Sequence, residues 1–144
     1  MNPRTPLLAT GLLAVVFAAP VPAAAAGLMR AACSVSVDYL LNGTLVEAYA
    51  RDFTLEEGTP FQDDFSTPTR EKGFSATVGK SAGKPTVVMN YFNDVGVFTS
   101  IVLDTSVVIT RPAATASTGR HTFTTSQGVA GNHLTTYTLR CQRL

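Results

Sequence analysis

The feature that most limits the fold of this chain is the strict alternation of apolar and polar residues in CSVSVDYLL, residues 33–41. A period of two places successive side chains on opposite faces of the backbone, which predicts a half-buried β-strand. Asn42-Gly43 follows directly, and this pair strongly favours the type I′ turn of a two-residue hairpin. We therefore expect residues 44–55 to return as a second strand beside the first.

The chain beyond this hairpin repeats one pattern, in which segments rich in β-branched and aromatic residues alternate with turn-forming residues. Further strands are predicted at 74–78, 86–92, 95–104, 106–110, 120–126 and 133–141. A tight turn is predicted at Asn93-Asp94, and loops at 79–85 and 111–119. No segment after residue 26 has the 3.6-residue apolar period of an amphipathic helix. The sequence thus predicts an all-β fold, an antiparallel β-sandwich or small barrel of seven to eight strands.

The N-terminus has the layout of a secretory signal peptide. Arg4 precedes an apolar run, and small residues ending in Ala24-Ala25-Ala26 follow. A transmembrane helix needs roughly 18 uninterrupted apolar residues, whereas Pro20 and Pro22 interrupt this run. We expect residues 1–26 to be a cleaved signal peptide and residues 27–144 to be a single exported β-sandwich domain, located in the periplasm or outside the cell.

The charge balance bears on the class of partner. Arg4 is the only one of the 11 Lys and Arg residues in the leader, so the remaining basic residues equal the 10 acidic residues in number. Nucleic-acid binding requires a basic excess on one face, and no such excess is present. We expect no nucleic-acid partner and no membrane insertion once the leader is removed.

The chain has two cysteines, Cys33 near the start of the first predicted strand and Cys141 near the end of the last one. Each shares an apolar face with its strand neighbours. An export signal and an even cysteine count favour a disulfide between them, which would join the terminal strands. Two buried, unbonded thiols are the alternative, and they would be favoured in a cytosolic protein.

Motifs for catalysis or cofactor binding are missing from the sequence. It contains no GxSxG elbow, P-loop, dinucleotide-binding fingerprint or HExxH helix. His121 and His133 are two ligands at most, fewer than a zinc site needs, and we interpret both as ordinary surface histidines. Calcium stays open, because Asp63-Asp64 and Asn93-Asp94 supply oxygen ligands. We therefore predict no catalytic residue, no cofactor and no transition-metal site.

The segment 61–74, FQDDFSTPTREKGF, is the candidate for partner binding because it combines charges, aromatic rings and a proline in a loop. The candidate residues are Phe61, Asp63, Asp64, Phe65, Arg70 and Lys72. The alternative is a loop whose phenylalanines cover one end of the core while its charges are solvated. A face of threonines at 122, 124, 136 and 138 is a second candidate surface.

These observations predict a non-enzymatic binding module that recognises another protein. Two alternatives stay open. One is a structural or assembly subunit of an envelope complex. The other is a small secreted hydrolase that uses carboxylates drawn from Glu56, Glu57, Asp63 and Asp64.

Overall fold

The computed structural model describes residues 27–110, 115–125 and 127–144, and the predicted signal peptide, 1–26, lies outside them. The described residues form eight β-strands. These are β1 (Arg30–Leu41), β2 (Thr44–Glu56), β3 (Phe61–Asp64), β4 (Lys72–Ser81), β5 (Lys84–Gly96), β6 (Thr99–Val108), β7 (Thr115–Thr125) and β8 (Gly131–Arg143). The described part of the chain contains no helix that is long and apolar enough to cross a membrane.

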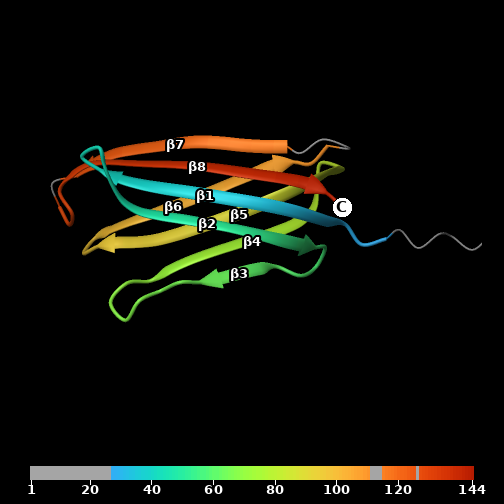
Figure 1. Cartoon of the computed structure of the whole chain (residues 1–144), viewed down its shortest axis with the longest axis horizontal. Helices are drawn as coiled ribbons and strands as arrows, with labels where there is room; N and C mark the ends of the chain where they lie inside the picture. The colour runs from blue at the N-terminus through green and yellow to red at the C-terminus, as the bar shows by residue number, and fades with distance from the viewer. Residues whose placement is uncertain (1–26, 111–114, 126) are drawn as a thin grey trace, which may run out of the picture.

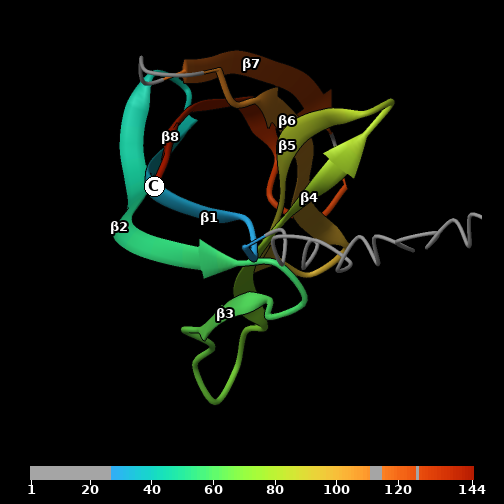
Figure 2. The ribbon, with the colours of Figure 1, turned by 90° about the vertical axis from the view of Figure 1, so that its right-hand side faces the viewer.

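The strands form two antiparallel sheets that pack face to face, with the orders β2-β1-β8-β7 and β3-β4-β5-β6 (Figure 1). Pairing of β1 with β8 places the first and last described strands side by side within one sheet. Strands that follow one another along the chain are therefore neighbours. They pair within a sheet, or they meet where the edges of the two sheets come together, at β2 with β3 and at β6 with β7. We call these two places the seams. At one seam, Thr105 of β6 and Ser117 of β7 are linked through their hydroxyl oxygens, 3.4 Å apart. Figure 2 shows the resulting barrel-like section. The predicted antiparallel sandwich is confirmed.

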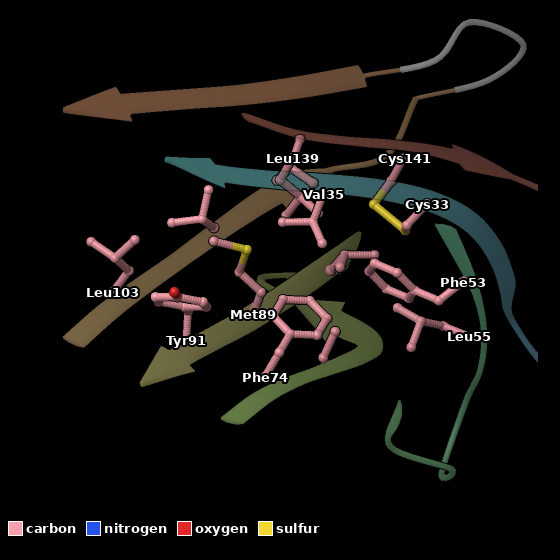
Figure 3. Packing of buried hydrophobic residues seen from close by; sticks show 14 of the residues in the cluster. Cys33, Val35, Phe53, Leu55, Phe74, Met89, Tyr91, Leu103, Leu139 and Cys141 are labelled. Carbon is pink, nitrogen blue, oxygen red and sulfur yellow. A yellow bond between two sulfur atoms is a disulfide. The ribbon is translucent and has the colours of Figure 1, made fainter. Parts of the chain in front are cut away.

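The core lies between the sheets and contains the inward side chains of both. The predicted alternation in β1 is confirmed, because Val35, Val37 and Tyr39 are all buried. Figure 3 shows Phe74, Met89 and other side chains of the second sheet pointing toward those of the first. This interior apolar surface is the main favourable contribution to folding.

The predicted disulfide is present. Cys33 of β1 and Cys141 of β8 stand directly opposite each other in the register, with their Cα atoms 4.2 Å apart, and their sulfurs are bonded (Figure 3). The bond is consistent with an oxidising, exported environment.

The first hairpin also forms as predicted. Asn42 and Gly43 both have positive φ, 52° and 81°, as a type I′ turn requires. The predicted loop at 79–85 is too long, however. β4 continues to Ser81 and β5 begins at Lys84, so only Ala82 and Gly83 form the turn, again with positive φ at both residues.

The tight turn predicted at Asn93-Asp94 is wrong, because β5 continues through both residues to Gly96. Asn93 is 0% exposed, and its amide donates hydrogen bonds to Glu47 and to the Tyr91 hydroxyl. A polar residue can occupy a buried strand position when such partners are available. The hairpin turns at Val97-Phe98 instead.

The loop predicted at 111–119 is also wrong for its second half, since 115–119 belong to β7, while 111–114 lie outside the described residues. Gly119 fits within the strand because the ring of Tyr137 on β8 occupies the space that a side chain at 119 would need. In the segment 61–73, a short strand, β3, pairs with β4 at the sheet edge. Pro68 lies beyond its end.

Candidate functional site

Two of the three phenylalanines of the predicted binding segment, Phe61 and Phe65, pack against β2. The ring of Phe61 stacks on Phe53 with 4.8 Å between centroids, and that of Phe65 stacks on Tyr49 at 4.6 Å. Both rings are partly buried against the core. They therefore close the seam between β3 and the other sheet.

Asp63 lies at the same seam. Its Oδ2 accepts hydrogen bonds from the Tyr49 hydroxyl, at 2.9 Å, and from Arg51 Nε, at 2.8 Å. Burial, together with the hydrogen bond to Asp63, raises the pKa of Tyr49. Asp63 thus links β3 to β2 through the neutral phenol of Tyr49 and the cationic side chain of Arg51.

Arg70 and Lys72 both turn toward Glu47 of β2. The Lys72 ammonium donates to Glu47 Oε1 at 2.6 Å, and Arg70 lies 4.0 Å from the same oxygen. The other oxygen of Glu47 accepts from Asn93 Nδ2 at 2.6 Å. One carboxylate of the first sheet therefore binds three groups of β4, β5 and the loop before β4.

Asp64 is the exception among the six candidate residues, because it is exposed on the outer face of the sheet. Its Oδ1 accepts the backbone N–H of Ser66 at 3.0 Å. Hydrogen bonds from Ser66 lower the pKa of the Asp64 carboxyl, which favours its ionised form. The structure brings the other five candidates together around β2 and leaves Asp64 facing solvent.

The β5–β6 hairpin carries several exposed or partly exposed apolar side chains on its outer face and at its tip. We call Phe92, Val97, Phe98 and Val102 the β5–β6 apolar face. The exposed Val88 lies farther along β5, beyond the hydrogen-bonded pair of Asn90 and Asp104. Phe92 of β5 stands directly opposite both Val102 of β6 and Gly73 of β4. Exposed apolar residues scattered singly need no explanation, whereas a contiguous set is typical of an interaction surface.

The tip of this hairpin is the most exposed part of the apolar face. Phe98 is 91% exposed and Val97 is 71% exposed. Phe98 also has a φ of 59°, in the left-handed region that is uncommon for a large side chain. Such backbone strain persists only where the surrounding structure holds it, and it clusters at functional sites.

The β7–β8 turn holds the tip in place at the same end of the molecule (Figure 1). Val129 N donates to Thr99 Oγ1 at 3.2 Å, and the Val129 side chain fills the space beside Gly96. Gly128, which has a φ of 64°, packs so closely on the Val97 carbonyl that no side chain fits there. The tip is therefore supported by the neighbouring sheet.

Two open depressions flank Phe92 on the outer face. One, of about 280 Å³, lies over β3, β4 and β5 and includes Asp64, Glu71 and Gly73 in its lining. The other, of about 700 Å³, lies beside the tip and includes Arg70, Val97 and Phe98 in its lining. Phe92 lines both, so a single ring stands between two recesses.

Sequence reasoning missed this site because it placed Val97 and Phe98 inside a strand. The Asn93-Asp94 pair suggested a turn, and the strand that follows was shifted accordingly. One signal pointed to the true position: Tyr91, Asn93 and Val95 keep the same phase, with every second residue inward. An alternation that continues to Val95 places the turn beyond it.

The interpretation of both histidines as surface residues is wrong for His133, which is only 1% exposed. Its Nδ1 lies 2.8 Å from the Tyr39 hydroxyl and its Nε2 lies 2.8 Å from the Val129 carbonyl. Both ring nitrogens therefore have partners, and His133 ties the β7–β8 turn to the core. Within the described residues, no group of three or more His, Cys, Asp or Glu side chains could hold a metal ion.

Comparison of the chain with models of known protein families found no match, and no curated protein matches it. The chemistry of the candidate site therefore rests on its own residues.

Proposed function

We propose that this protein is an exported, non-enzymatic binding module, located in the periplasm or outside the cell, that recognises another protein through the β5–β6 apolar face. The observation that carries the proposal is Phe98, an aromatic ring that is 91% exposed at a strained turn. Aromatic anchors of this kind supply much of the energy of protein interfaces.

The surroundings of Phe98 support the same function. A rigid sandwich that presents a supported hairpin loses little conformational entropy when it binds, which favours affinity. The disulfide is consistent with an oxidising compartment, and residues 1–26 have the layout of an export signal.

Site-specific photo-crosslinking tests the proposal. A photo-reactive residue is placed at position 98 or 102 of the full chain, and at Ala116 as the control, because Ala116 is an exposed position on β7 in the other sheet. We expect one discrete crosslinked partner from positions 98 and 102 and none from 116. Equal crosslinking from all three positions, or none from any, would contradict the proposal.

The same experiment separates the binding module from an assembly subunit. Crosslinks between two copies of this chain, together with polymers in sedimentation analysis, would favour the assembly subunit over the binder.

A further inference from the structure

We infer that the partner inserts an arginine side chain into the depression beside Phe92 and places its guanidinium group between Asp64 and Glu71. This inference rests on the proposed function and adds the chemistry of the partner to it. The depression is called the Gly73 hollow below.

The size of the Gly73 hollow favours one side chain over a small molecule. Its volume is about 280 Å³, below the roughly 300–1,000 Å³ that is usual for small-molecule sites. The floor is open because Gly73 has no side chain, and the nearest atom to a Cβ built there is the Asp63 carbonyl oxygen, at 3.9 Å. The ring of Phe92 and polar groups of Ser75 and Asn90 are also part of the lining.

The charges around the hollow favour a cation. Asp64 and Glu71 are both exposed there, and Asp94 and Asp104 lie at outward positions of β5 and β6 on the same face. Of the nearest basic residues in the sequence, Lys72 also lines the hollow, but its ammonium is bonded to Glu47 of the other sheet. Arg70, 4.0 Å from Glu47, lines the neighbouring depression beside the tip. Lys84, at an outward position of β5, lies at the opposite end of that strand.

Arginine fits this combination better than lysine does. Its planar guanidinium stacks on an aromatic face and donates hydrogen bonds to carboxylates in a fixed fork. Phe92 offers the face. Asp64 and Glu71 offer the carboxylates, and one oxygen of Asp64 is already fixed by the Ser66 N–H.

The test is a titration of the full chain with N-acetyl-arginine amide, followed by backbone amide NMR shifts. The amides of N-acetyl-norleucine and N-acetyl-glutamate are the comparison probes. We expect shifts at Asp64, Gly73 and Phe92 with the arginine probe that neither comparison probe produces. Equal shifts with the norleucine probe, or arginine shifts elsewhere on the surface, would overturn the inference.

Two variants and a matched control sharpen the titration. Asp64→Asn with Glu71→Gln should weaken binding of the arginine probe about tenfold, because hydrogen bonds to charged groups are lost. Gly73→Val should abolish binding by filling the hollow while keeping the fold, which thermal unfolding checks. Asp38→Asn with Asp52→Asn removes the same charge from exposed positions of the other sheet and should change nothing. If the charge variant binds as tightly as the parent, the inference is wrong.

Failure here is distinguishable from failure of the proposed function. If the partner still crosslinks to position 98 in the Gly73→Val variant with undiminished yield, the hollow is not used and the apolar face remains the binding surface.

Discussion

Lys72 on β4 donates a hydrogen bond of 2.6 Å to Glu47 on β2, so a largely buried ion pair joins the two sheets. The exposed fractions of the two side chains are 13% and 23%. Their mutual attraction is therefore screened less than that of a surface pair. Loss of Lys72 leaves the poorly solvated Glu47 carboxylate with the more distant Arg70 and the neutral Asn93 amide as its remaining partners.

The first prediction concerns this pair. Lys72→Met should lower the free energy of unfolding by about 3 kcal/mol, the lower end of the range for breaking a buried pair. Adding Glu47→Gln should recover part of that loss, because it removes the carboxylate charge that has lost its nearest cation. Urea unfolding measures both. The surface pair Arg30 and Glu56, 3.7 Å apart, is the control, and Arg30→Met should cost about 0–1 kcal/mol. Equal losses for Lys72→Met and Arg30→Met would contradict this account.

The second prediction concerns the disulfide. Cys33 and Cys141 are separated by 108 residues, and the chain-entropy model gives about 4.7 kcal/mol for a closed loop of about 100 residues. Reduction should add two hydrogens to the mass and lower the free energy of unfolding by roughly 2–5 kcal/mol. Urea unfolding with and without reductant tests it, with a Cys33→Ala, Cys141→Ala variant that should not respond to reductant. An unchanged mass after reduction would rule the bond out.

The third prediction concerns the buried imidazole. Tyr39→Phe leaves Nδ1 of His133 without its partner and should cost about 1–3 kcal/mol, the usual cost of an unsatisfied buried polar group. Tyr137→Phe is the matched control, because its hydroxyl donates to Thr105 at the less buried seam, and it should cost less. Thermal unfolding compares the two variants. The reverse order would show that the Tyr39 hydroxyl contributes little.

The fourth prediction concerns high pH. Burial raises the pKa of Tyr39, Tyr49 and Tyr91 in the folded state. The folded protein thus holds these protons more tightly than the unfolded chain, whose tyrosines titrate at about pH 10. Stability should be complete below about pH 10 and fall as the pH rises above it toward the folded-state values. Urea unfolding across this range measures the slope, which Tyr49→Phe should reduce. A flat profile would contradict the assignment.

The alternation of apolar residues predicted the fold class. Together with the Asn42-Gly43 turn signal it predicted the first hairpin, and together with the export signal and the even cysteine count it predicted the disulfide. In β1, the phase of Val35 and Val37 identifies the inward face without further information, because one face of a sheet must be buried. Cys33 and Cys141 could be paired because both lie on such faces at opposite ends of the chain.

The errors came from polar residues with partners distant in the sequence. Asn93 looks like a turn residue, and its burial depends on a hydrogen bond to Glu47, 46 residues earlier in the chain, besides one to the Tyr91 hydroxyl. Gly119 looks like a loop residue, and only the Tyr137 ring explains its place in a strand. The exposure of Phe98 was missed as a result of the error at Asn93, because the turn was predicted at Asn93-Asp94 and not at Val97-Phe98. The residues next to each of these positions in the sequence do not indicate these tertiary contacts.

The fifth prediction concerns Phe98→Gly, a variant that removes the exposed ring proposed to anchor the partner. Glycine adopts positive φ without strain, so this variant should keep or raise the free energy of unfolding, by up to about 1 kcal/mol. Ala82→Gly is the matched control, because Ala82 also has a positive φ, of 48°, in the turn at the opposite end of β5.

The decisive measurement is crosslinking from position 102 in these two variants, with urea unfolding measured on the same samples. We expect Phe98→Gly to be at least as stable as the parent yet to lose the crosslinked partner, while Ala82→Gly keeps it. Undiminished crosslinking in a folded Phe98→Gly variant would show that the exposed ring is not the anchor and would contradict the account.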